Sequence, residues 1–242
     1  MVHTLKPLKR IPVYMKVYQA IESDILSGNL NEGDLLPTEV ELCQLFKVTR
    51  SSVREGIRLL EQAGFVRRGA AKRLIVSRPK IGELAEATSQ GLARGGVTFR
   101  EVWQALSLMY PSAGALAARH LSQAAVLEVS SHHEALKKAG QGDFDAIVGA
   151  AVGFFQAIAN GLDNRVLLTM LQSLNMMIEA SLRQVIENTP NARNRIFDAQ
   201  RHILEAIENR DEAEAAEWMS KHIDDLKRGY DVASVDLERT VL

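Results

Sequence analysis

The sequence predicts a mainly α-helical protein in two parts: an N-terminal unit of three helices and a β-hairpin, followed by a bundle of six or seven helices. Apolar residues recur at helical spacing along most of the 242-residue chain. Two short runs, 65–68 and 74–76, fit strands instead. From Thr98 onward no strand-like alternation is found, so this part is predicted to be all-α.

Three helices are predicted in the first 64 residues. Thr38 and Glu41 have the spacing of a capping box, which opens the second helix. Gly28 and Gly64 are suited to end the first and third helices, because glycine adopts the conformation of a helix C-terminus without strain. The predicted ranges are 13–26, 39–46 and about 50–62.

The two strand-like runs follow the third helix and flank a basic tip from Gly69 to Arg73. They are therefore predicted to pair as a hairpin. The order helix, helix, tight turn, helix, hairpin is that of a winged helix-turn-helix, which we expect over residues 1–78.

The rest of the chain is predicted as a linker, a helical domain and a tail. The linker, 79–97, contains a short helix at about 81–93, and the tail is 233–242. Between them, turn-forming residues such as Gly140, Gly142 and Pro190 divide an all-α domain over 98–232. Its expected helices are roughly 98–120, 122–139, 143–160, 164–188, 191–209 and 211–230.

The charge is distributed unevenly along the chain. The whole sequence has a net charge of −1. Residues 1–80 hold 14 Lys and Arg against 8 Asp and Glu, a net charge of +6, and the remainder holds 15 against 22, a net charge of −7. A basic unit joined to an acidic one indicates that the N-terminal part binds a polyanion.

The lone cysteine, Cys43, has no partner for an internal disulfide, which fits a reducing cytoplasm. The first ten residues lack the apolar core of a secretory signal. The longest uncharged stretch, Ala146 to Leu162, is interrupted by polar residues and is interpreted as a buried helix rather than a membrane span. We therefore expect a cytoplasmic protein with no membrane partner.

The third predicted helix has the pattern of a DNA-reading helix. Arg50, Arg54 and Arg58 recur every four residues and form one basic stripe. Val53, Ile57 and Leu60 lie on the opposite side, which faces the core. Hydroxyl groups at its N-terminus can bind phosphate together with the free backbone N–H groups; they belong to Thr49, Ser51 and Ser52.

Three motifs in this region resemble the DNA-binding domain of GntR-family bacterial transcription regulators. They are Leu36–Glu39, Val48–Glu55 and Leu59–Val66, within a match over about residues 11–78. The resemblance implies base and phosphate contacts by Arg50, Arg54, Ser51 and Ser52, with Thr49 beside them.

Two positions depart from the family pattern. Val40 stands where the family usually has an arginine that contacts DNA. The wing usually carries Gly-x-Gly, and those places hold Ala71 and Arg73. Lys72 and Arg73 add positive charge at the tip, and we include both among the expected DNA-binding residues.

The helical part resembles the ligand-binding domain of the FadR subfamily, the FCD type. The similarity is carried by Phe154–Ala159 with Asp163 and Asn164, and by 204–211, Ala215, Ala216 and Met219–Ile223. Many members of the subfamily bind a divalent metal through one Asp and three His. The matching positions here are Ala151, Phe155, Gln200 and His222. One imidazole cannot hold Zn²⁺ or Ni²⁺, so we expect no metal and no cofactor.

The same replacements indicate a more apolar pocket. Leu106 stands where the family often has an arginine that binds effector carboxylates, and methionines such as Met176 supply adaptable side chains. One interpretation is a pocket for a bulkier, apolar effector, and the other is that the site is packed shut and the domain only dimerises. The expected pocket residues are Leu106, Ala151, Phe155, Met176, Gln200 and His222.

These features predict a homodimeric, sequence-specific regulator that binds a palindromic operator in double-stranded DNA, usually as a repressor, under control of a small molecule. The alternative is a regulator or architectural DNA-binding protein whose helical domain binds no effector. An enzyme is not expected, because the sequence offers no Ser/His/Asp, Cys/His or paired-carboxylate arrangement and no Gly-rich phosphate loop.

Overall fold

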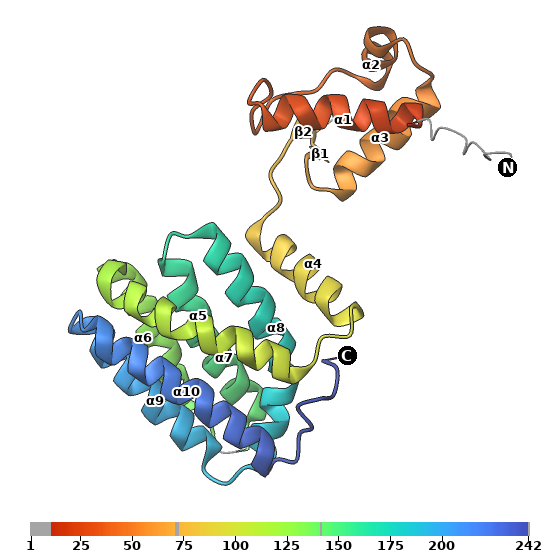
Figure 1. Cartoon of the computed structure of the whole chain (residues 1–242). Coiled ribbons are helices and arrows are strands. Elements are labelled where there is room, and N and C mark those ends of the chain that lie inside the picture. Colours follow the sequence, from red (N-terminus) through yellow and green to blue (C-terminus); the bar gives the residue numbers. More distant parts are fainter. Residues whose placement is uncertain (1–10, 71–72, 141, 242) are drawn as a thin grey trace, which may run out of the picture. The chain divides into compact units, whose positions relative to one another are not determined.

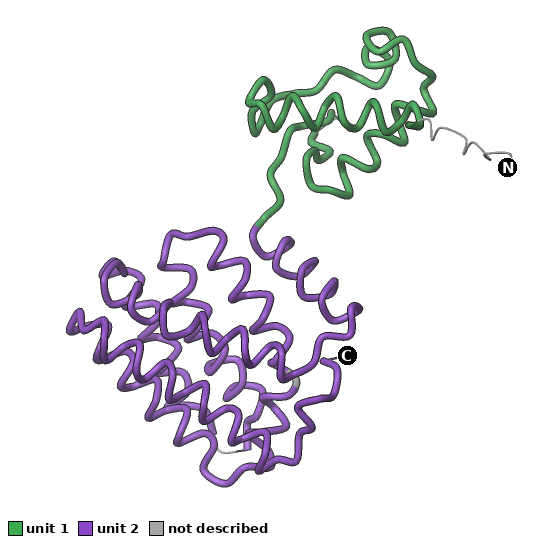
Figure 2. The backbone as a smooth tube through the Cα atoms, in the orientation of Figure 1, with its two compact units in different colours: residues 1–80 green, residues 81–242 purple. Residues whose placement is uncertain are grey.

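The computed structural model describes residues 11–70, 73–140 and 142–241. The chain forms two compact units, 1–80 and 81–242 (Figure 2). The first contains three helices and a hairpin (Figure 1): α1 (Val13–Leu26), α2 (Glu39–Phe46), α3 (Arg50–Gln62), β1 (Val66–Arg68) and β2 (Leu74–Val76). The order predicted for a winged helix-turn-helix is confirmed.

Close contact between α1 and α3 holds the first unit together. Gly56 on α3 allows this approach, because a Cβ at this position would lie 2.9 Å from Val17 Cγ1 and 3.0 Å from the Tyr14 carbonyl oxygen. Lys47 makes the turn between α2 and α3 with a left-handed backbone, φ 54°. The buried core comprises Val17, Ile21, Leu36, Leu42, Val53, Ile57, Leu60, Val66, Leu74 and Val76.

The hairpin and the capping box form as the sequence predicts. β1 and β2 are antiparallel, with Val66 opposite Val76. The Thr38 side chain accepts a hydrogen bond from the Glu41 backbone N–H, at 3.3 Å. The Glu41 carboxylate in turn accepts one from the Thr38 N–H, at 2.7 Å. This reciprocal pair fixes the start of α2.

Seven helices form the described part of the second unit. They are α4 (Ile81–Arg94), α5 (Phe99–His120), α6 (Gln123–Lys138), α7 (Phe144–Gly161), α8 (Arg165–Asn188), α9 (Ala192–Glu208) and α10 (Glu212–Val232). The predicted mainly α-helical architecture is confirmed, and the predicted helix ends agree with the observed ones within two residues.

The second unit joins helices that are neighbours in the chain and helices that are far apart in it. α6 packs against α7 and α7 against α8, while α5 packs against α10. α7 is the one helix in the described part of the chain that is long and apolar enough to cross a membrane, by length and composition alone. Its neighbours α6 and α8 and its row of buried residues show that it is a core helix of the bundle.

Two segments are more integrated into the bundle than their sequences indicated. The expected linker, 79–97, contains α4, which packs against α8 and belongs to the second unit. The described part of the expected tail 233–242 returns to the start of α5, where the Phe99 N–H donates to the Arg239 carbonyl at 3.2 Å. Val235 and Leu237 are buried there. The apolar residues of both segments have partners that are distant in sequence.

Candidate nucleic-acid interface and ligand pocket

Helix α3 presents one packed face and one exposed basic face. Val53, Ile57 and Leu60 are completely buried. Arg50 and Arg54 expose 70% and 69% of their side chains. The amphipathic pattern read from the sequence therefore places these two guanidinium groups in solvent, on a helix whose other side is anchored in the core.

The N-terminus of α3 is capped by Thr49. Its Oγ1 atom accepts a hydrogen bond from the Ser52 N–H at 3.4 Å and lies 3.0 Å from the hydroxyls of both Ser51 and Ser52. Three hydroxyls thus gather where the helix dipole is positive. Such a cluster can exchange its internal hydrogen bonds for bonds to a phosphate oxygen.

The carboxylate of Glu39, on α2, lies next to this basic face of α3. Its oxygens lie 3.6 Å from Arg50 Nε, 4.0 Å from Arg54 Nε and 3.8 Å from Arg68 Nη2. Arg68, on β1, also pairs with Glu61 at 2.9 Å. We name Arg50, Arg54, Arg68 and Glu39 the recognition cluster. Glu39 and Arg68 were missed in the sequence, because only the fold brings α2, α3 and β1 to one place.

The other basic residues expected to bind DNA differ in their exposure and in their ion pairs. Arg58 is held by Glu55 through two hydrogen bonds, at 2.6 and 3.0 Å, so a ligand must compete for it. Arg73 is exposed and lies beside α2, where it helps Thr38 lower the pKa of Glu41, the Thr38 hydrogen bonds having the larger effect. Lys72 lies outside the described residues.

In the helical unit, Ala151, Phe155 and His222 meet around a small internal cavity. Phe155 stacks between Tyr110 and His222, with ring centroids 5.0 and 4.5 Å apart. The cavity that remains has a volume of about 20 Å³, room for about one water molecule. The three rings therefore fill most of this site.

Buried polar groups line the same cavity or bond to a residue that lines it. The Tyr110 hydroxyl donates to Asn175 Oδ1 at 2.6 Å, and among the described residues Asn175 Nδ2 has no hydrogen-bond partner. Gln200 is fully buried and donates to the Ala151 carbonyl at 3.3 Å. Burial lowers the pKa of His222 to about 4, so its imidazole is neutral at physiological pH.

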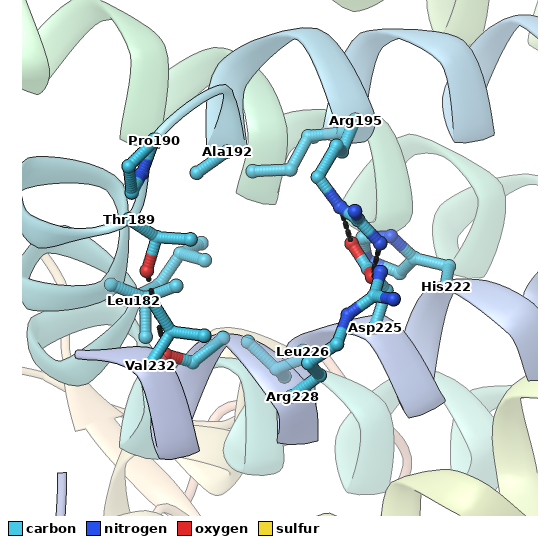
Figure 3. Close-up of a pocket in the computed structure, with 13 residues that line it drawn as sticks. Leu182, Thr189, Pro190, Ala192, Arg195, His222, Asp225, Leu226, Arg228 and Val232 are labelled. Atoms are coloured by element: carbon cyan, nitrogen blue, oxygen red, sulfur yellow. Dashed lines mark hydrogen bonds and ion pairs between the residues drawn. The ribbon is translucent and has the colours of Figure 1, made fainter. Parts of the chain in front are cut away.

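A larger pocket of about 300 Å³ opens between α8, α9 and α10 (Figure 3). We name it the α8–α10 pocket. It shares Leu182, Ile196, His222 and Leu226 with the small cavity. Its full lining is Leu182, Val185, Thr189, Pro190, Ala192, Arg195, Ile196, His222, Asp225, Leu226, Arg228, Gly229 and Val232.

Charged groups lie along one side of the α8–α10 pocket. Arg195 donates through Nε to Asp225 Oδ2 at 2.7 Å, and its Nη2 bonds Oδ1. Arg228 also bonds Oδ1 of the same carboxylate (Figure 3). On the opposite side the Thr189 hydroxyl donates to the Gly229 carbonyl at 3.4 Å.

Comparison with known families agrees with this geometry. The model for bacterial regulatory proteins of the gntR family matches residues 13–76, and the model for the FCD domain matches residues 101–225. The chain belongs to the GntR family and carries an FCD domain. Its first unit corresponds to the gntR match and its second to the FCD match.

Relatives of this GntR protein are named as regulators. It is 28% identical over 228 residues to the HTH-type transcriptional repressor NanR of Klebsiella aerogenes, covering 90% of this chain and 85% of the relative. It is 22% identical to the HTH-type transcriptional regulator LutR of Bacillus subtilis, covering 85% and 97%. The protein is accordingly a DNA-binding transcription regulator with a ligand-binding domain.

A solved structure, Streptococcus agalactiae GntR, has the same fold. It superposes with a TM-score of 0.65 at 20% identity and covers 89% of this chain and 99% of its own. This likeness extends over both units of the chain.

The metal set expected from the FCD resemblance does not fit the residues present. Ala151 and Phe155 offer no ligand atoms on their side chains, and the Gln200 amide is committed to the Ala151 carbonyl. Among the described residues no three His, Cys, Asp or Glu side chains lie close enough to hold a metal ion. We therefore derive no step of this FCD domain through a metal.

The residues expected in the effector pocket of the GntR protein lie in different places in the structure. Ala151, Phe155 and His222 line the small cavity. Leu106 is completely buried and lines neither space described above. Met176 is corrected: it is 40% exposed, because the turn of α8 directs Asn175 and Met177 inward instead.

The α8–α10 pocket was missed in the sequence. Asp225 and Arg228 have helical ion-pair spacing, which is a weak local signal. Arg195 joins them from another helix, thirty residues away. Only the packing of α9 on α10 reveals the three as one group.

Proposed function

We propose that this GntR regulator is a cytoplasmic, homodimeric repressor that binds a palindromic operator, with α3 of each protomer in the major groove of one half-site. The exposed Arg50 and Arg54 on a helix with a fully packed opposite face carry the proposal. A helix-turn-helix presents its second helix to base edges in this way, and two-fold symmetry of a dimer matches a palindrome.

The arginines and the capping hydroxyls contact different parts of the DNA in this proposal. Arg50 and Arg54 read guanine through paired hydrogen bonds to O6 and N7, each worth roughly 1–3 kcal/mol of discrimination. Thr49, Ser51 and Ser52 bind backbone phosphate and set the depth of the helix in the groove. The wing and the net positive charge of residues 1–80 add affinity that does not depend on sequence.

A small molecule in the helical unit controls operator binding in this proposal. The effector must bind the operator-free state of the dimer more tightly than the operator-bound state, since equal affinity shifts nothing. The α8–α10 pocket supports it, because about 300 Å³ lies at the lower end of the range for small-molecule pockets.

The second candidate is a regulator or architectural protein whose helical unit only dimerises. The observation that favours it is the small cavity of about 20 Å³ at the FCD metal positions. A dialysable extract of the source cells that releases the protein from its operator supports effector control. If no extract releases it, the second candidate stands.

DNA recognition is tested by selecting an operator from random duplexes and measuring Arg54→Ala by gel shift. We expect a loss of about 1–3 kcal/mol on the operator and a smaller loss on unrelated DNA. The control is Arg78→Ala, in the segment after β2, whose side chain is 64% exposed. Equal losses on both DNAs for Arg54→Ala would contradict the assignment of α3.

A further inference from the structure

We propose that the α8–α10 pocket binds a small amphipathic carboxylate, whose anionic end is held by Arg195 and Arg228 without a metal ion. The proposal rests on the effector control proposed above and names the chemical class of the effector. Four features of the pocket carry it: its charge, the unused donors of its arginines, its apolar walls and its size.

The charged side of the pocket has more positive than negative groups. Two guanidinium groups share the single carboxylate of Asp225. That side chain is 26% exposed, against 43% for Arg195 and 57% for Arg228. The excess of one positive charge favours an anionic ligand, and the exposed guanidinium groups are open to it.

Arg228 has donors to spare. A guanidinium carries five N–H groups in a planar fork. Within the described residues Arg228 makes one ion pair, through Nη2 to Asp225 Oδ1. Asp225 holds the fork in place next to the pocket (Figure 3). A ligand carboxylate can therefore add to Arg228 without breaking the bond between Arg195 and Asp225.

The outer side of the same ion pair is less suited to an anion. An open groove there adds Lys221, but also Asp198 and Asp224. Arg195, Asp225 and Arg228 line this groove too, and with the added residues its positive and negative groups are equal in number. Lys221 already pairs with Glu217 at 2.6 Å. An anion is therefore favoured more on the side of the α8–α10 pocket, where no further carboxylate of the described residues lines the space.

The walls of the pocket select an apolar body. Apolar side chains make up much of the lining, and in Figure 3 Leu182 and Val232 lie across the space from Arg195. The apolar residues with larger side chains are Leu182, Val185, Ile196, Leu226 and Val232. Burying a methylene group against such walls contributes about 0.8 kcal/mol. The pocket volume of about 300 Å³ accommodates a short alkyl chain or one aromatic ring, and a large ligand such as an acyl-coenzyme would not fit within it.

The ligand needs no metal ion, because Arg195 and Arg228 supply the positive charge that pairs with its carboxylate. His222 is the one residue at the FCD metal positions with a metal-binding side chain, and it stacks on Phe155 at 4.5 Å between centroids. The positive charge next to the pocket therefore comes from Arg195 on α9 and Arg228 on α10.

The test uses the full-length protein after dialysis against EDTA. Octanoate and phenylacetate are titrated by calorimetry beside octanamide and phenylacetamide, which have the same shape without the charge. We expect the carboxylates to bind about tenfold or more tightly than the amides, because a charged hydrogen-bonded pair contributes more than a neutral one. We also expect the carboxylates to release operator DNA.

Three variants test whether the carboxylate binds in the α8–α10 pocket. Arg228→Gln should weaken octanoate binding about tenfold and raise by a similar factor the octanoate concentration that releases the operator. Arg201→Gln, on the exposed face of α9, is the matched control and should behave as the unchanged protein. Val232→Trp fills the pocket from a position that is 52% exposed, so it should abolish octanoate binding without a folding defect.

The outcomes separate the two proposals. Amides that bind as well as the acids, or an Arg228→Gln variant with unchanged affinity, would overturn the carboxylate class. If no probe binds but a cell extract still releases the operator, the class is wrong and effector control stands. If the extract has no effect either, both fail.

Discussion

The two units hold arginines against a carboxylate in two different ways. In the recognition cluster, Glu39 lies 3.6–4.0 Å from Arg50 and Arg54, and both arginines remain about 70% exposed. In the α8–α10 pocket, Asp225 is hydrogen-bonded directly to both arginines. Loose, exposed ion pairs contribute little to stability, so a polyanion can easily replace the carboxylate as partner of the arginines. Direct hydrogen bonds to one carboxylate fix the positions of Arg195 and Arg228 before a small ligand binds.

The difference extends to the cores beneath the two sites. The first unit has one small hydrophobic core, and the second has a much larger one. Because buried area grows with domain size, the first unit should have the lower stability. Its recognition helix is itself a main contributor to the small core, through Val53, Ile57 and Leu60.

Ile57→Ala gives the largest expected effect. Ile57 is completely buried, and truncation of such a side chain costs about 2–5 kcal/mol. We expect the first unit to unfold separately at lower temperature and DNA binding to be lost, with the second unit folded. Calorimetry should show two unfolding transitions, and only the one of the first unit should shift to lower temperature. The control Leu45→Ala removes an apolar side chain that is 66% exposed and should change stability little. A single transition that moves as a whole would show that the units are coupled.

His222 provides a test confined to the second unit. Burial lowers its pKa to about 4, whereas the pKa of an exposed imidazole is about 6.5. Between these values the unfolded chain binds a proton that the folded chain does not, so the free energy of unfolding rises with pH. Above about pH 6.5 His222 is neutral in both states and the free energy of unfolding is at its full value. As the pH drops to about 4, the free energy of unfolding falls by up to about 3 kcal/mol.

We expect His222→Gln to flatten this dependence. The measurement is urea unfolding of the second unit at several pH values within the window. His120→Gln, at an exposed position at the end of α5, is the control. Equal slopes for His222→Gln and the unchanged protein would show that His222 titrates normally in the folded chain.

Local signals explain why so much of the fold could be predicted. Each bundle helix from α5 to α8, and α10, begins at a residue whose side chain caps the helix: Thr98, Ser122, Asp143, Asn164 and Asp211. Such caps are visible as single letters before an apolar period. The exposed arginines of α3 could be predicted for the same reason, because one helix contains the entire pattern.

The parts that could not be predicted depend on contacts between distant segments. Glu39 and Arg68 join the recognition cluster from α2 and β1. Arg195 meets Asp225 only because α9 packs on α10. Met176 was placed one residue away from the inward position that Met177 occupies, since α8 carries apolar residues on more than one side. Composition cannot choose between adjacent faces of such a helix.

Glu39→Gln should give the smallest effect and tests the loose pairing directly. Removal of the charge frees Arg50, Arg54 and Arg68 from a competitor of DNA phosphate. Exposed ion pairs contribute about 0.2–1 kcal/mol, so we expect binding to operator and unrelated DNA to tighten together, by about two- to fivefold. Gel shifts over a range of salt concentrations measure both. Glu61→Gln, which removes a partner of Arg68 alone, is the matched control and should change less. Weaker binding of the operator alone would mean that Glu39 aims Arg50 and Arg54 at the bases, and the loose pair would then be a positioning device rather than a competitor.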